Sequence, residues 1–300
     1  MSRRRISAVV TALALSAAVP VLVPTSSASA ATCSSYPSWV AGKAYVTGDI
    51  VRYTDGKAYI AEHDNPGYDP VISTWYWTPY NCDSGSGSGS GTPVGNFVVS
   101  EAQFNQMFPN RNGFYTYSGL TAALNAYPGF ANTGGDETKK QEAAAFLANV
   151  SHETGGLVHV VEQNTANYPH YCDWSQPYGC PAGQSAYYGR GPIQLSWNFN
   201  YKAAGDALGI DLLNNPSLVQ TDASVAWKTG LWYWNTQSGP GSMTPHNAMV
   251  NGAGFGQTIR SINGSLECDG RNPAQVQSRV TTYQQFTQIL GVSAGANLYC

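Results

Sequence analysis

The stretch FLANVSHETGGLVHVVEQN, residues 146–164, holds two glutamates in unlike settings, and the surrounding chain is interpreted from it. Phe146 and Val150 recur at helical spacing and Glu153 follows three positions later, so these side chains share one face of a helix. Helix-forming alanines precede this run, and two glycines follow at once, where a left-handed residue can end a helix. The sequence therefore predicts a helix over Asp136–Thr154, with Glu153 on its last turn.

Beyond the glycines the pattern changes to alternation. Val158, Val160 and Glu162 fall on one side of a predicted short strand, and Glu162 leads into a polar run that ends at Asn167. A carboxyl at the end of an apolar stripe loses water and favours its protonated form, whereas a carboxyl in polar surroundings stays ionised. Two such carboxyls indicate divided roles, with Glu153 as general acid and Glu162 as general base. Spacing alone leaves open that both are ordinary surface residues.

Length and composition indicate a folded chain of about two domains. The 300 residues are 42% hydrophobic and only 11% charged. Three arginines at positions 3–5 precede an apolar run over residues 6–23, and Ala28-Ser29-Ala30 offers small residues for cleavage. We predict a secretory signal peptide over residues 1–30 and an extracellular location. Pro20 argues against the alternative of a membrane anchor.

Charge and motif content exclude several classes of partner. Removing the signal peptide takes away three arginines and no acid, which changes the formal net charge from −3 to −6. We therefore expect no binding to nucleic acid or membrane, and a monomer that holds a neutral polymer by stacking and hydrogen bonds. We expect no metal and no other cofactor, because His152-Glu153 begins like the zinc motif HExxH but has Gly156 in place of the second histidine.

Six cysteines remain after the signal peptide, and a secreted chain meets oxidising conditions, so disulfides are expected. Their clustering suggests Cys33 with Cys82, Cys172 with Cys180, and Cys268 with Cys300. The first bond would join the ends of a unit too small to have much core.

That unit, residues 31–82, is predicted to be a small all-β module. Ala44–Val46, Ile50–Tyr53 and Lys57–Ala61 read as short strands separated by Gly-Asp and Asp-Gly turns. It contains more aromatic rings than such a core can enclose, so some rings should face solvent, where they can stack on sugars. Residues 83–94 begin DSGSGSGSGTP, which is typical of a flexible linker.

Residues 95–300 carry mainly helical patterns. Ser100 followed by Gln103 predicts a helix start, and Gly189–Ser196 predicts an extended cleft floor. On that floor Gln194 and Ser196 lie on one side, and the polar series continues to Asn200. The expected helices, besides the central one, are Tyr115–Tyr127, Tyr201–Leu208, Ser217–Tyr233 and Pro273–Leu290, and residues 164–189 are expected to form a loop. We expect a mostly α, two-lobed domain with its cleft between the lobes.

Three motifs resemble those of the bacterial family 19 glycoside hydrolases, which are lysozyme-like chitinases: HETGG at 152, VEQNTANYPHYCDWSQPYGCPAG at 161 and YYGRGPIQLSWNFNY at 187. The resemblance covers roughly Gly95 to Cys300. It implies a two-lobed, lysozyme-like fold and an endo-acting enzyme that cleaves chitin between N-acetylglucosamine units with inversion. By this resemblance Glu153 is the acid and Glu162 the base.

The resemblance also implies binding roles for further residues. Gln194, Ser196, Asn200, Asn263 and Arg279 fall on substrate-binding and water-holding positions, with Ser196 and Asn263 expected to hold the attacking water. We also expect Glu267 to pair with Arg279 across the cleft and steer Glu162; the alternative is an ordinary surface ion pair. Arg190 is a weaker candidate for the same charge network.

The first domain resembles the small chitin-binding modules attached to bacterial chitinases, on YPSWVAGKAYVTGDIVRY and WYWTPY. By that resemblance Trp39, Tyr45 and Tyr59 belong to the core. The rings assigned to the binding face are Tyr68, Trp75, Tyr76 and Trp77, although packing remains the alternative for each. Two other functions stay open for the whole chain: a chitin-binding protein that has lost catalysis, and a muramidase acting on peptidoglycan.

Overall fold

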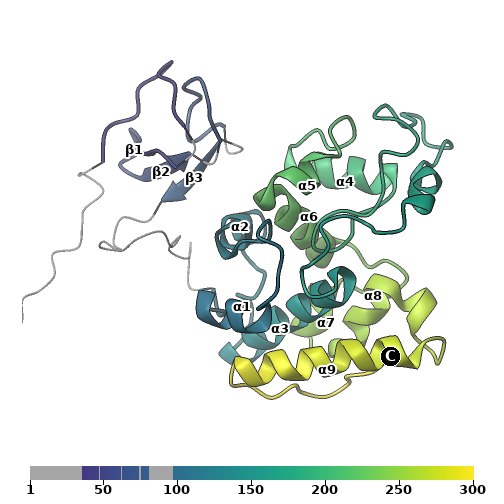
Figure 1. The fold of residues 1–300 in the computed structure, drawn as a ribbon. Helices are drawn as coiled ribbons and strands as arrows, with labels where there is room; N and C mark the ends of the chain where they lie inside the picture. The colour runs from purple at the N-terminus through teal and green to yellow at the C-terminus, as the bar shows by residue number, and fades with distance from the viewer. Residues whose placement is uncertain (1–35, 47, 62, 74–75, 81–96) are drawn as a thin grey trace, which may run out of the picture.

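The computed structural model describes residues 36–46, 48–61, 63–73, 76–80 and 97–300. Within them a small β-sheet precedes a larger helical domain, as the sequence predicts (Figure 1). The expected signal peptide at 1–30, the linker at 83–94 and the Cys33–Cys82 bond lie outside the described residues. In the part of the chain that is described, no helix combines the length and the apolar character needed to span a membrane.

The sheet has three antiparallel strands in the order β1-β2-β3. Strands β1 (Ile50–Arg52) and β2 (Ala58–Ala61) form where alternation predicts them, and β3 (Trp77–Tyr80) completes the sheet. The strand expected at Ala44–Val46 is reduced to one isolated bridge, between Tyr45 and Asn65.

Trp77 is buried, so its assignment to the binding face is wrong. Its side chain is 1% exposed, its ring centroid lies 5.0 Å from that of Tyr45, and its indole N–H donates to the carbonyl of Tyr68 at 2.7 Å. A ring closed to solvent on all sides cannot stack on a sugar. The aromatic residues at 75–77 suggest a surface patch from the sequence alone, but the pairing of β3 with β2 places the side chain of Trp77 in the core.

The other aromatic residues of the module divide more nearly as expected. Tyr45 and Tyr59 are buried and Trp39 packs against them. Tyr68 is 45% exposed, and its ring centroid lies 4.7 Å from that of Tyr76. Their role in binding stays a prediction, and Trp75 lies outside the described residues.

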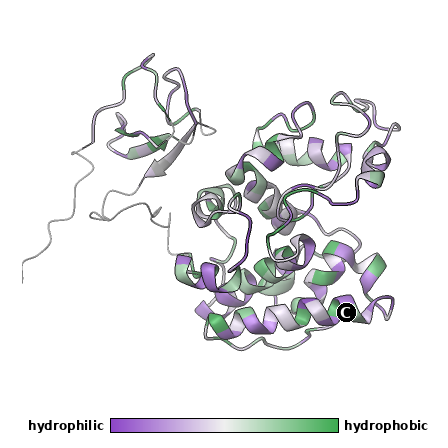
Figure 2. Ribbon diagram, viewed as in Figure 1, coloured by the Kyte–Doolittle hydropathy of each residue, from purple (hydrophilic) through white to green (hydrophobic). Residues whose placement is uncertain are grey.

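The helical domain is built around α3 (Asp136–Thr154), whose bounds agree with the prediction. Gly155 ends it at a φ of 62°, in the left-handed region that favours glycine. The first core packs α3 against α1 (Glu101–Met107), α2 (Tyr117–Ala123), α7 (Pro245–Val250), α8 (Phe255–Glu267) and α9 (Pro273–Ile289). Helix α9 lies at one edge of the body, where hydrophobic and hydrophilic residues alternate along it (Figures 1 and 2).

A second core lies on the other side of the body and makes the domain two-lobed. It gathers the segment after the short 3-10 helix η3 (Thr165–Tyr171), α4 (Asn198–Leu208) and α5 (Leu218–Thr221). Helix α6 (Ala223–Thr236) joins the lobes, because Trp227 and Trp234 belong to the first core while Trp232 belongs to the second. A further 3-10 turn, η2 (Leu124–Ala126), extends α2.

Three helix predictions need correction. The helix expected over Ser217–Tyr233 is two helices, because Asp222 turns the chain and caps α6 by accepting from the Val225 N–H. Helix α4 starts at Asn198, three residues earlier than expected. Helices α7 and α8 were not predicted. Gly256 weakens the pattern of α8, yet a Cβ there would lie 2.0 Å from the Tyr299 carbonyl oxygen, so close packing of the C-terminal segment requires a glycine.

Two of the expected disulfides are present, Cys172–Cys180 and Cys268–Cys300. The first closes a loop that directly follows η3, and the second ties the chain end to the end of α8. Both bonds lie beside segments that carry candidate site residues.

Candidate active site

A cavity of about 530 Å³ lies between the two lobes and contains both glutamates. Glu153 reaches it from the last turn of α3, and Glu162 reaches it from the loop that leads into η3. The other polar residues lining the cavity are Tyr171, Gln194, Ser196, Asn200, Tyr233 and Asn263. This volume lies within the usual range for ligand sites, and hydroxyl and amide groups dominate its polar lining.

Glu153 is held by a buried arginine. Its side chain is 20% exposed, and its Oε1 accepts from Nη2 of Arg279 at 2.5 Å. Arg279, on α9, is only 1% exposed, and it also donates to both carboxylate oxygens of Glu267 at 2.7 and 2.8 Å and to Oδ1 of Asn149 at 3.1 Å. One cation therefore serves two carboxyl groups.

Arg279 makes two of its hydrogen bonds to the carboxylate of Glu267. Burial acts to raise its pKa, but the hydrogen bonds and charge of Arg279, with help from Asn263, outweigh burial and lower the pKa. Burial likewise acts to lower the pKa of Arg279, and the charges of Glu153 and Glu267 reverse this and raise it. At neutral pH the Arg279–Glu267 pair is therefore fully ionised, and Glu153 is the third member that faces the cavity.

Two predictions about this pair are wrong. Arg279 and Glu267 are 1% and 2% exposed and do not line the cavity, so neither contacts a substrate there. The pair lies behind Glu153 within one lobe and does not bridge the cleft, and its hydrogen bond goes to Glu153 and not to Glu162. The 12-residue separation allowed Arg279 and Glu267 to pair, but it did not indicate which catalytic glutamate the pair would contact.

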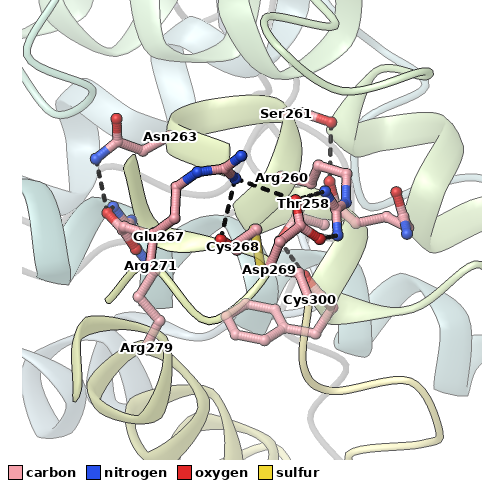
Figure 3. The surroundings of a disulfide bond; sticks show 12 residues. Thr258, Arg260, Ser261, Asn263, Glu267, Cys268, Asp269, Arg271, Arg279 and Cys300 are labelled. Atoms are coloured by element: carbon pink, nitrogen blue, oxygen red, sulfur yellow. Dashed lines mark hydrogen bonds and ion pairs between the residues drawn. A yellow bond between two sulfur atoms is a disulfide. The ribbon is translucent and has the colours of Figure 1, made fainter. Parts of the chain in front are cut away.

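Asn263 links the cavity to this network. The Nδ2 of Asn263 donates to Oε1 of Glu267 at 2.7 Å (Figure 3). Asn263 also lines the cavity. The backbone of Asn263 departs from helical geometry inside α8, with φ −143° and ψ 28°. One amide N–H is used by Glu267, which leaves a second N–H donor and the carbonyl oxygen acceptor on the same side chain.

Glu162 sits among neutral donors. Its Oε1 accepts from Nδ2 of Asn167 at 2.7 Å and from the hydroxyl of Tyr171 at 3.0 Å. The backbone N–H of Gly189 lies 3.4 Å from Oε2, and the backbone N–H of Glu162 donates to the carbonyl of Gly189 at 2.8 Å. Burial, followed by the bond to Glu162, raises the pKa of Tyr171 to about 12, so its hydroxyl keeps its proton at neutral pH. These bonds hold the carboxylate of Glu162 in a fixed direction.

The strand expected from Val158 to Glu162 does not form. Leu157 turns the chain with a φ of 62°, Val158 is 40% exposed, and only Val161 pairs, in an isolated bridge with Arg190. The side chain of Leu157 is buried and its backbone carbonyl accepts from Asn112. Packing therefore overrides the alternating pattern and leaves Glu162 on a loop.

The expected extended floor is instead a tight turn. Arg190 and Leu195 pair across it, and Gln194 adopts a φ of 51° with its side-chain amide donating to the Gly191 carbonyl at 3.0 Å. Gln194 and Ser196 line the cavity as predicted, but Ile193 and Leu195 line it too, although both are buried, so the predicted division into a polar and an apolar side is not observed. Asn200 lines it from the first turn of α4, and not from an extended segment.

Tyr171 and Tyr233 were not singled out from the sequence. The hydroxyl of Tyr233 donates to the Ser261 carbonyl at 2.9 Å, and burial together with the charge of Glu153 raises its pKa to about 12. Tyr171 had a usable signal, since it follows Glu162 by nine residues in the same polar run and precedes a disulfide cysteine. Tyr233 had none, because it lies in a helix far from either glutamate in sequence.

Among the described residues, no group of three or more histidine, cysteine, aspartate or glutamate side chains is arranged to hold a metal ion. Arg190, considered as a member of the charge network, is buried in the second lobe and bonds to neither glutamate. The chemistry available in the cavity is therefore that of two carboxyl groups in different hydrogen-bonded settings, surrounded by neutral polar side chains.

Comparison with known proteins agrees with this geometry. Residues 98–300 match the family described as chitinase class I. A bacterial family 19 chitinase structure is 83% identical and superposes with a TM-score of 0.68, covering 68% of this chain and 100% of that one; chitinase C from Streptomyces griseus is 76% identical at the same TM-score, covering 70% and 100%.

Plant proteins are also similar over most of their length. Chitinase 3 from Oryza sativa subsp. japonica is 42% identical over 246 residues, which cover 72% of this chain and 76% of that protein. Endochitinase A from Zea mays is 46% identical over 211 residues, covering 68% and 71%. With the two-lobed fold and the paired glutamates, these matches place the chain in glycoside hydrolase family 19, the class I chitinases.

Proposed function

We propose that this chain is a secreted endochitinase that hydrolyses the β-1,4 bonds of chitin with inversion, using Glu153 as acid and Glu162 as base. The observation that carries the proposal is the arrangement of the two carboxyls. They enter one cavity from opposite lobes, one beside a shared cation and the other among neutral donors. Family membership supports chitin and chito-oligosaccharides as substrates.

Glu153 delivers the proton to the leaving oxygen. The Arg279–Glu267 pair behind it is already neutral as a unit, so a protonated Glu153 adds no charge to a poorly hydrated region. When the proton leaves, the new carboxylate is met by Nη2 of Arg279 without rearrangement. The network thus accommodates both states of the acid, which general acid catalysis requires.

Glu162 activates the water. Its Oε1 is occupied by Asn167 and Tyr171, whereas Oε2 has only the long contact with the Gly189 N–H, so Oε2 is the oxygen available to accept a proton. Ser196 and Asn263 line the cavity with a hydroxyl and a carbonyl oxygen that can hold that water. Gln194 and Asn200 supply amides that match the N-acetyl and hydroxyl groups of the polymer.

The remaining parts of the proposal concern location and attachment. The arginines, apolar run and small residues of positions 1–30 support secretion, and the aromatic content of residues 31–82 supports a chitin-binding module. Tyr68, which is 45% exposed, and Tyr76, which lies beside it and is partly buried against the module core, are the described rings that remain candidates for stacking. The Gly/Ser run between the domains would tether binding to catalysis without coupling their folds.

Inversion is tested by the anomer first formed. An attacking water between the base and the sugar requires the two carboxyl groups to stand about 6.5–9.5 Å apart, and it gives an α-anomer from a β-linked substrate. Proton NMR of a fresh hydrolysate of a soluble N-acetylglucosamine hexamer, recorded before mutarotation, should show excess α-anomer. Excess β-anomer at the earliest times would remove Glu162 from the base role and indicate a substrate-assisted or covalent route.

A further inference from the structure

The segment that orients Glu162 is itself a surface element with no buried residue. Helix η3 supplies both side-chain donors to Oε1, Asn167 and Tyr171, and a third contact from the hydroxyl of Tyr168 to the backbone carbonyl of Glu162 at 2.9 Å. None of the seven residues of η3 is buried. Tyr171 packs partly against the second core, and no other residue of η3 belongs to that cluster. Hydrophobic burial therefore explains little of how the rest of η3 keeps its position beside Glu162.

An aromatic stack supplies the missing anchor. The Tyr168 ring lies 3.6 Å from the Tyr188 ring, centroid to centroid, with the planes only 10° apart. On Tyr188, the guanidinium carbon of Arg190 lies 3.6 Å from the ring centroid. We call these three residues the aromatic column. Its two contacts are a ring stack and a cation–π contact, both of which are attractive in proteins.

The inner end of the column is fixed. Arg190 is 3% exposed, and it donates to Oε1 of Gln220 at 2.7 Å, to the Ala186 carbonyl at 2.7 Å and to the Tyr201 hydroxyl at 2.8 Å. Among the residues that the structure describes, no carboxylate forms an ion pair with Arg190. The π face of Tyr188 thus meets a buried cation whose other partners are neutral, the setting in which a cation–π contact contributes most.

We propose that Tyr168 is a positioning residue for the base: the aromatic column fixes η3 to the buried Arg190, and η3 in turn holds the Glu162 carboxylate in its working direction. Tyr168 does not line the cavity, so it acts through Glu162 and not on the substrate. The inference rests on the proposed base role of Glu162.

The test compares Tyr168→Leu, which removes the aromatic face, with Tyr168→Phe, which keeps it. With the soluble N-acetylglucosamine hexamer as substrate, Tyr168→Leu should lower kcat by about tenfold or more while KM changes less than about threefold. Tyr168→Phe should stay within about threefold of the parent kcat and KM.

Controls separate the possible failures. Tyr299→Leu removes an exposed tyrosine whose hydroxyl contacts only Gln277 and should leave kcat unchanged. Glu162→Gln, assayed in parallel, tests the base: if it keeps activity, the proposed function fails and not the column alone. If Glu162→Gln is inactive while Tyr168→Leu merely melts earlier with normal kcat and KM, the column is structural and the inference is overturned.

Two further outcomes are covered. Equal losses in Tyr168→Phe and Tyr168→Leu would assign the effect to the hydroxyl and also overturn the role of the stack. If Tyr168→Leu does not fold, Tyr188→Leu repeats the test from the other ring and leaves the sequence of η3 intact. The same fall in kcat with little change in KM is then expected.

Discussion

Replacing Arg279 with methionine tests the ion network behind the acid. The change keeps most of the side-chain length but removes every hydrogen bond that Arg279 donates to Glu153, Glu267 and Asn149. Glu267, 2% exposed, would keep Asn263 as its remaining hydrogen-bond partner in this network. Removing one member of a buried pair costs about 3–5 kcal/mol, because the other charge is left uncompensated. For a domain of this size that corresponds to a fall in Tm of about 6–20 °C.

The matched control is Arg260→Met. Arg260 pairs with Asp269 through two hydrogen bonds of 2.8 and 2.9 Å, but the two side chains are 28% and 52% exposed. An exposed pair contributes about 0–1 kcal/mol. Urea unfolding at pH 7, followed by circular dichroism, measures both variants against the parent. Free energies of unfolding that agree within about 1 kcal/mol would refute the claim that the Arg279 network is a buried, mutually dependent unit.

A double variant sharpens the result. Arg279→Met combined with Glu267→Leu removes both buried charges, so it should recover most of the stability lost in Arg279→Met alone. Its kcat should stay low, since Glu153 no longer meets a cation when it gives up its proton. Recovery of stability without recovery of activity would distinguish electrostatic support of the acid from general damage to the fold.

Three other results are expected. Glu153→Gln cannot deliver a proton, so chitin hydrolysis should fall by about 10² or more while a pull-down on chitin persists. Deleting residues 31–92 should leave turnover of soluble oligomers unchanged and lower it on insoluble chitin; equal loss on both would contradict a tethering role. His246 bonds to buried Glu142 at 2.6 Å, and that bond, opposed by burial, raises the pKa of His246. The His246–Glu142 bond therefore stabilises the fold fully below about pH 6.5, and this contribution is lost as the pH rises through the raised pKa of His246 in the folded protein. Urea unfolding at several pH values should show a decrease in the free energy of unfolding over this range that His246→Gln lacks.

The central helix could be predicted residue by residue because its signals are local. The alanine run, the apolar spacing that ends at Glu153 and the glycine at 155 act within the helix itself, and α3 begins and ends where they place it. The start of α1 was equally readable, since Ser100 and Gln103 form the expected capping box. The prediction for Trp77 was wrong for the opposite reason. Its burial depends on a non-local contact, the pairing of Trp77 with Ala61 of β2, sixteen residues earlier in the chain.

The loop around Glu162 shows how packing overrides a pattern. Alternation from Val158 to Glu162 fits a strand, but within the described residues this segment makes one isolated bridge, between Val161 and Arg190. The turn at Leu157 instead buries the Leu157 side chain in the first core, and Glu162 then bonds through its backbone N–H to Gly189 of the second lobe. The same holds for Gln194, which lines the cavity from a turn with a left-handed backbone that alternation did not predict.

The two halves of the site differ in how far along the chain their support comes from. Glu153 is held by Arg279, 126 residues away, and through it by Glu267, so the acid works only when α3, α8 and α9 are packed together. Glu162 takes its side-chain donors from Asn167 and Tyr171, five and nine residues on, in η3, which has no fully buried residue and whose Tyr171 packs partly against the second core. Local opening of the base segment therefore costs little of the core and leaves the ion pair at Glu153 intact. It follows that substitutions in η3 should change activity with small effects on global stability, whereas substitutions around Arg279 should change both together.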